Sequence, residues 1–170
     1  MRSAFTQAGF YPFEGPSTTD LSLIPLSIRY KLDRAEIKLH LAQWQQISLD
    51  DRQRLLDTRC GSATEVAGYR ALLIEIIERY FSSPPTSQPL SNDAPWADRS
   101  RWPQVVIDQC GKQSITLRPV EQWQGLSDMD RHALFVLGRS KHALDEFIAA
   151  MRLFFGDEKS DDPGLRRDNA

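Results

Sequence analysis

Apolar residues recur at helical spacing through much of the chain. The clearest stripe forms one face of a long helix and comprises Val66, Tyr69, Leu72, Leu73, Ile76, Ile77 and Tyr80. Ser62 or Thr64 is placed to cap this helix, which we expect to end near Phe81. An earlier helix begins at Pro25, because the fixed φ of proline suits the first helical position. The pattern predicts a mainly α protein.

The segment after this first helix is harder to assign. Residues 37–41 alternate like a short strand, but five residues do not decide between strand and helix. A short helical turn around Trp44 follows. Ser48 and Asp51 then form a Ser-x-x-Asp capping signature at the start of another helix.

The second half of the chain repeats this pattern. Residues 43–56 return as residues 122–135, with seven of fourteen positions identical, and the apolar rhythm continues on both sides. A repeated unit usually buries its apolar face against its copy. We therefore predict two similar helical units, an internal duplication packed about a pseudo-twofold axis. Its structural anchors are Trp44, Trp123, Ser48, Ser127, Asp51, Asp130, Arg52 and Arg131.

The recurring tryptophans allow two interpretations. They form a paired aromatic platform for a ligand, or they are core anchors repeated by duplication; we favour the core, because large aromatics dominate burial. Capping explains the repeated aspartates. The arginines that follow them, Arg52 and Arg131, either tie the units together through backbone carbonyls or face a partner.

Composition divides the chain into five segments. We expect an extended aromatic N-terminal arm at 1–22, a first helical unit at 23–81, a Pro/Ser-rich linker at 82–101, a second helical unit at 102–155 and a disordered tail at 156–170. The arm carries Phe10, Tyr11 and Phe13, which suit packing on the surface of the domain.

Composition also narrows the class of protein. The 170 residues are 41% apolar and carry a net charge of −2 with both signs interspersed. This argues against nucleic acid as a partner, which needs a clustered basic face. No apolar run approaches a membrane span, and the N-terminus lacks the apolar stretch of a signal peptide. We expect a soluble cytoplasmic protein.

Candidate chemistry is sparse. The histidines His40, His132 and His142 make no metal-binding motif, so we expect surface histidines and no metal or other cofactor. Cys60 precedes a helix N-terminus, where a thiolate would be stabilised. A half-buried cysteine at a helix junction is the interpretation we favour. No phosphate loop or Gly-x-Ser-x-Gly motif is present, and we expect no catalytic residue.

The part of the first unit that does not repeat is charged. Residues 29–34 read Arg-Tyr-Lys-Leu-Asp-Arg, whereas their counterpart at 107–112 is chemically different. When a scaffold is shared, the unshared charges are better candidates for function. We select Arg29, Lys31 and Asp33; the alternative is an ordinary solvated helix face.

The same region carries a family resemblance. The string Ile-Pro-Leu-Ser-Ile-Arg-Tyr-Lys-Leu-Asp at 24–33, followed by Ile37-Lys38-Leu39, Trp44, Ser48, Arg52, Leu55 and Cys60, resembles the nitrate reductase associated protein family. The similarity covers about residues 10–155. The family is small, mostly cyanobacterial, and encoded near genes for assimilatory nitrate reductase and molybdopterin synthesis. It has a cysteine before the Ile-Pro pair, where this chain has Leu23.

The resemblance implies a protein that accompanies nitrate reductase, and it implies no catalytic residue. Our first hypothesis is a non-catalytic accessory or assembly factor for this molybdenum enzyme. Its partner surface would combine Arg29, Lys31 and Asp33 with Phe10 and Phe13 of the arm. The alternatives are a small thiol-dependent enzyme or redox carrier using Cys60, and a structural subunit of the reductase complex.

Overall fold

The computed structural model describes residues 9–89 and 94–156. Of these described residues, 57% lie in nine helices and 3% in strands. The elements in order are α1 (Pro16–Thr19), α2 (Leu26–Arg34), β1 (Ile37–Lys38), α3 (Leu41–Trp44), α4 (Leu49–Asp57), α5 (Ala63–Tyr80), β2 (Thr86–Ser87), α6 (Gln104–Lys112), α7 (Val120–Gln124), α8 (Asp128–Arg139) and α9 (Leu144–Phe155). The prediction of a mainly α protein is confirmed.

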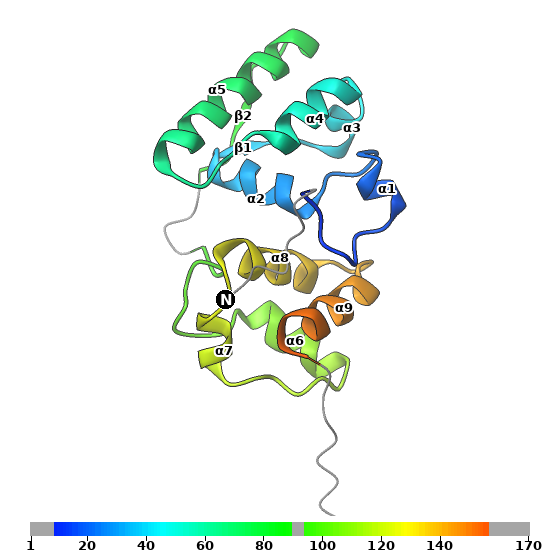
Figure 1. Ribbon diagram of the computed structural model, residues 1–170, viewed down its shortest axis with the longest axis vertical. Helices are drawn as coiled ribbons and strands as arrows, with labels where there is room; N and C mark the ends of the chain where they lie inside the picture. Colours follow the sequence, from blue (N-terminus) through cyan, green and yellow to red (C-terminus); the bar gives the residue numbers. More distant parts are fainter. Residues whose placement is uncertain (1–8, 90–93, 157–170) are drawn as a thin grey trace, which may run out of the picture.

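The helices form two blocks stacked along the long axis (Figure 1). One block contains α2 to α5 with the strands, and the other contains α6 to α9. Helices α2 and α8 meet where the blocks join, and α8 also packs on α6 and α9. Each block therefore offers one central helix to the other.

Each block has its own apolar core. The first core is built around Ile28, Trp44, Leu55, Tyr69 and Ile76, all at most 1% exposed. The second core surrounds Val106, Trp123, Leu134, Phe147 and Ala150, none of them exposed. Tyr11 lies before the first block and Leu26 is the first residue of α2, yet both side chains belong to the second core. The N-terminal segment thus helps to join the two blocks.

Helix starts follow the predicted capping chemistry. The side chain of Ser62, not Thr64, accepts a hydrogen bond from the backbone N–H of Glu65, and the Glu65 carboxylate accepts one from the backbone N–H of Ser62. Helix α5 ends before Phe81, as predicted. At the start of α4, the Ser48 side chain accepts a hydrogen bond from the backbone N–H of Asp51. These local bonds satisfy N–H groups that no helical carbonyl can reach.

The two strands within the described residues pair antiparallel. Ile37 lies opposite Ser87, and Lys38 lies opposite Thr86. Strand β2 falls inside the expected linker, so part of that segment is anchored to the first block. Residues 90–93 of the linker lie outside the described residues.

The N-terminal arm is packed onto the body and is not extended throughout. It includes the helical turn α1. The Tyr11 hydroxyl donates to the Asp130 carboxylate at 2.8 Å, and the ring of Phe13 stacks on that of Tyr11 at 5.1 Å. Residues 1–8 of the arm and residues 157–170 of the expected disordered tail lie outside the described residues.

Both blocks contain the same local contacts around tryptophan. The Trp44 indole N–H donates to the Leu21 carbonyl at 2.7 Å, and that of Trp123 donates to the Asp98 carbonyl at 2.8 Å. A guanidinium lies over each indole at 5.8 Å, from Arg52 in one block and Arg131 in the other. The pseudo-twofold relation between the blocks stays a prediction.

Candidate functional site

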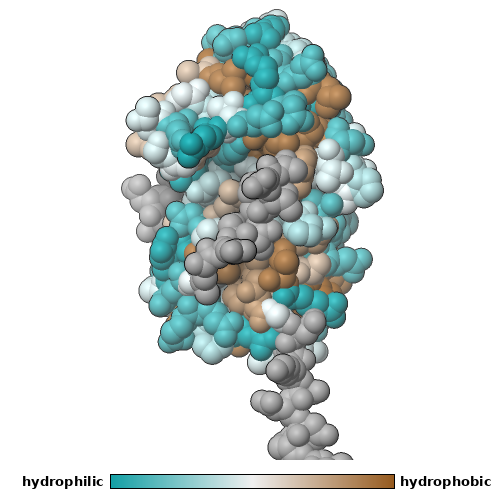
Figure 2. All heavy atoms as spheres, in the orientation of Figure 1, coloured by the Kyte–Doolittle hydropathy of each residue, from teal (hydrophilic) through white to brown (hydrophobic). Residues whose placement is uncertain are grey.

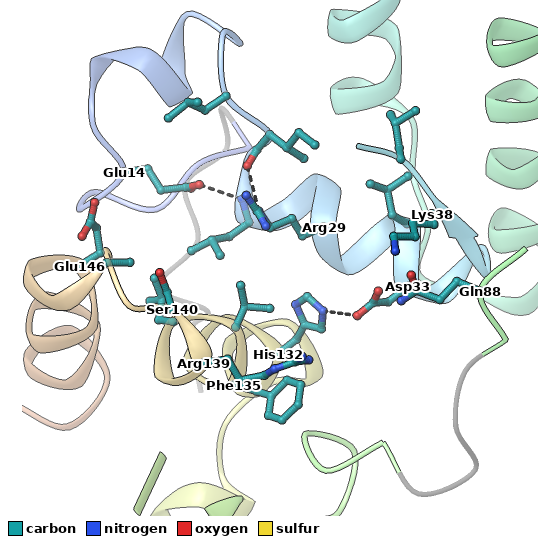
Figure 3. Close-up of a pocket in the computed structure, with 18 of the residues that line it drawn as sticks. Glu14, Arg29, Asp33, Lys38, Gln88, His132, Phe135, Arg139, Ser140 and Glu146 are labelled. Atoms are coloured by element: carbon teal, nitrogen blue, oxygen red, sulfur yellow. Dashed lines mark hydrogen bonds and ion pairs between the residues drawn. The ribbon is translucent and has the colours of Figure 1, made fainter. Parts of the chain in front are cut away.

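A groove of about 630 Å³ lies where the two blocks meet. Its walls come from α2 and β1 on one side and from α8 and the start of α9 on the other. Residues 13 and 14 of the arm close one end, and Gln88 lies at the other. Figure 3 shows the labelled side chains of these elements around the groove. The packing of α2 against α8 therefore creates the site.

Three cations line the groove. Arg29 on α2, Lys38 on β1 and Arg139 on α8 are all exposed. Arg29 donates through Nε to the Ile24 carbonyl at 3.3 Å, and burial of the group lowers its pKa. The Arg139 guanidinium lies 5.4 Å from the centre of the Phe135 ring. Within the described residues, the terminal nitrogens of all three make no hydrogen bond, so they are available to a ligand.

The carboxylates of the groove are engaged within the protein. Glu14 accepts hydrogen bonds from the backbone N–H groups of Leu26 at 2.8 Å and Tyr11 at 2.7 Å. Burial raises the pKa of Glu14, and the two backbone bonds oppose that effect. Asp33 accepts from His132, and Glu146 lies in the first turn of α9, where the helix dipole favours a negative charge.

The Asp33–His132 pair links the two blocks. His132 Nε2 lies 2.7 Å from Asp33 Oδ2 (Figure 3). The imidazole is 0% exposed and meets the edges or faces of Tyr30 and Trp96 at 5.5 and 5.3 Å. Its Nδ1 makes no hydrogen bond within the described residues. An ionised carboxylate only accepts, so we assign the proton of a neutral imidazole to Nε2.

The expectation of surface histidines is therefore wrong for His132, whereas His40 and His142 are exposed. His132 lies on the apolar side of α8 between Arg131 and Ala133, and all three are buried. No motif marks this histidine. In the sequence, the position of this histidine beside the apolar residues of α8 was the available signal.

Lys31 points away from the groove. Its ammonium donates to the carbonyls of Leu56 at 2.6 Å, Thr58 at 2.7 Å and Leu55 at 3.2 Å, at the C-terminal end of α4. Burial lowers the pKa of Lys31 to about 8. These contacts favour a structural role for Lys31 over the expected role in recognition.

Some of the other expected partner residues line the groove, and one does not. Arg29, Asp33 and Phe13 line the groove, and Phe13 also meets the edge of Phe154 at 6.5 Å. Phe10 is half-buried against the first core and lies outside the groove. The structure thus brings three of the five residues to one place, where sequence reasoning missed Lys38, His132 and Arg139.

The environment of Cys60 disfavours a reactive thiolate. The residue is 6% exposed, and burial raises the pKa of its thiol despite the nearby Arg34 and Lys31. Burial also raises the pKa of Cys110 to about 11. Both cysteines are free. Thiol chemistry at Cys60 therefore has less support than its position before α5 suggested.

The described residues hold neither a candidate metal site nor a candidate membrane-spanning helix. In the described part of the chain, no three or more side chains of His, Cys, Asp or Glu come together as a metal site. None of the described helices has the length and apolar character needed to cross a membrane.

The fold and the groove define a small helical protein in which two cores enclose a charged surface cleft. The model of the conserved nitrate reductase-associated protein family matches residues 10–154. The chain belongs to this family. Among curated proteins and solved structures, none gives a significant match.

Proposed function

We propose that the chain is a non-catalytic accessory protein that binds nitrate reductase through the groove between α2 and α8 and supports the activity or maturation of the enzyme. The family description names an association with nitrate reductase. The groove is the surface that suits such a partner. Direct contact with the reductase is the step that this proposal adds.

The observation that carries the proposal is the set of unused cations in the groove. Charged groups usually find partners, and Lys31 and Arg52 each bind three carbonyls in this protein. Arg29, Lys38 and Arg139 line the groove from three separate elements, and their terminal nitrogens make no hydrogen bond within the described residues. Charges arranged in this way steer a partner and fix its orientation.

The contacts of the body also suit a binding module. The side chains with chemistry of their own, Cys60 and His132, are buried, and His132 is bonded to Asp33. The repeated tryptophans and their arginines support the two cores, in keeping with the internal duplication predicted from the sequence. We therefore assign the repeat to the scaffold and recognition to the groove at its centre.

A charge reversal with a matched control tests the proposal. Arg139 and Lys112 are both exposed and both lie in the last turn of a helix, α8 and α6 respectively. Reversing either charge costs a similar unfavourable interaction with the helix dipole. Only Arg139 lines the groove.

We expect Arg139→Glu to reduce co-purification of nitrate reductase and its activity in cells, while Lys112→Glu leaves both near the wild-type level. Circular dichroism and thermal melting establish that each variant is folded. Equal retention of the reductase by wild type and a folded Arg139→Glu variant would remove the groove from the account. Loss of binding in both variants would show that the reductase binds another surface or responds to the net charge of the protein.

A further inference from the structure

The charged side chains of the groove also indicate what kind of partner segment binds there. This inference rests on the proposed function. The groove holds three carboxylates as well as three cations, so its net charge does not indicate a partner. Their bonding does. Two carboxylates, Glu14 and Asp33, accept hydrogen bonds from Leu26, Tyr11 and His132.

The remaining carboxylate, Glu146, lies in the first turn of α9, and its charge is compensated there by the free N–H groups of the helix. Arg29 donates through Nε to the Ile24 carbonyl and lies near Glu14 and Asp33, whose negative charges oppose the lowering of its pKa by burial. The side chains of Lys38 and Arg139 make no hydrogen bond or ion pair within the described residues, and the Arg139 guanidinium lies 5.4 Å from the centre of the Phe135 ring. Lys38 and Arg139 are therefore the groove cations left to pair with a ligand carboxylate.

Apolar surface lies between these cations. Leu23 at the rim is 40% exposed, and Phe135 and Val136 on α8 are half-buried beside Arg139. Figure 2 shows hydrophobic patches in brown among hydrophilic residues on one face of the molecule. Water-exposed apolar groups beside cations suit a ligand that carries both apolar and acidic side chains.

We propose that the groove binds an extended acidic segment of its protein partner, with carboxylates facing Lys38 and Arg139 and an apolar side chain facing Leu23 and Phe135. Arginine suits carboxylate because its planar fork presents two parallel donors. A basic segment would meet these cations, and two backbone N–H groups already occupy the carboxylate of Glu14.

The test uses a synthetic fluorescein-labelled peptide, Glu-Leu-Glu-Glu-Leu-Glu, and two matched peptides in which every Glu is replaced by Gln or by Lys. Binding to the full chain is followed by fluorescence anisotropy at low salt. We expect only the acidic peptide to bind. Its dissociation constant should rise ~10-fold in Arg139→Glu, stay near the wild-type value in Lys112→Glu, and rise with added salt.

The proposal is overturned if the Lys or Gln peptide binds as well as the acidic peptide, or if the acidic peptide binds Arg139→Glu and the wild type equally. It is also overturned if sedimentation shows a dimer that Arg139→Glu dissociates, because a second copy would then occupy the groove. These outcomes are separable from failure of the proposed function. Suppose that the wild type does not bind the acidic peptide, but that Arg139→Glu still abolishes binding of the reductase. The proposed function then stands, and only the proposal of an acidic segment fails.

Discussion

Replacement of Lys31 by methionine distinguishes a structural lysine from a recognition lysine. Methionine keeps most of the apolar stem and removes the ammonium. That ammonium bonds the carbonyls of Leu56 and Thr58 at 2.6 and 2.7 Å and of Leu55 at 3.2 Å. These groups lie at the end of α4, where no further helical N–H is available to them.

The magnitude follows from those bonds. A hydrogen bond contributes about 0.5–1.5 kcal/mol net, and the third bond of Lys31 is long. Relief from burying the ammonium offsets part of the loss. We therefore expect Lys31→Met to lower the free energy of unfolding by about 2 kcal/mol, which corresponds to a fall in Tm of about 4–8 °C in a chain of this size.

Urea unfolding followed by tryptophan fluorescence measures the change, and an unaltered denaturant slope would show that the transition is of the same kind. The matched control is Lys38→Met, because Lys38 is exposed on β1 and its amine makes no hydrogen bond within the described residues. We expect the control to change stability by less than ~0.5 kcal/mol. If Lys31→Met instead melts like the wild type but no longer retains nitrate reductase, the structural assignment of Lys31 is wrong.

Four further outcomes are expected. Trp44→Ala and Trp123→Ala should each lose about 3–5 kcal/mol of stability, because both indoles are 0% exposed; a loss below ~1 kcal/mol in urea melts would contradict their role as core anchors. Tyr11→Phe should destabilise the protein by about 1 kcal/mol through loss of the buried bond to Asp130, and an unchanged melt would show that the arm is not held there. Iodoacetamide at pH 9 should alkylate Cys60 and Cys110 much more slowly in the folded than in the urea-unfolded chain. The reason is that burial raises both thiol pKa values and leaves less thiolate in the folded state. Equal rates would show that the thiols are accessible. Cys60→Ser should also leave support of the reductase intact, and loss of reductase activity with a folded variant would favour thiol chemistry.

Local features of the fold were predictable from the sequence. Ser48, Ser62 and Pro25 mark helix starts because capping and proline geometry depend on residues within one helical turn. The alternating segment around Ile37 supplied a strand of two residues, but its partner β2 lies in a segment whose prolines suggested only a linker.

The site depends on contacts that no local pattern reports. Asp33 and His132 are 99 residues apart in the chain, and their bond exists only because α2 packs on α8. Lys31 is charged and lies between Arg29 and Asp33 in sequence, yet its direction around α2 carries it to α4. Helical rotation separates neighbours by about 100° per residue, so a charged run need not form one surface.

The most direct test of the central claim is site-specific photocrosslinking to nitrate reductase. A photoreactive benzoylphenylalanine is placed at Lys38 in the groove or at Lys112 on α6, and each folded variant is irradiated with the purified enzyme. Both positions are exposed, so accessibility to the probe is comparable. The account predicts a crosslink to the reductase from position 38 and none from position 112. A crosslink from position 112 alone, or from neither position when the complex is otherwise demonstrated, would contradict it.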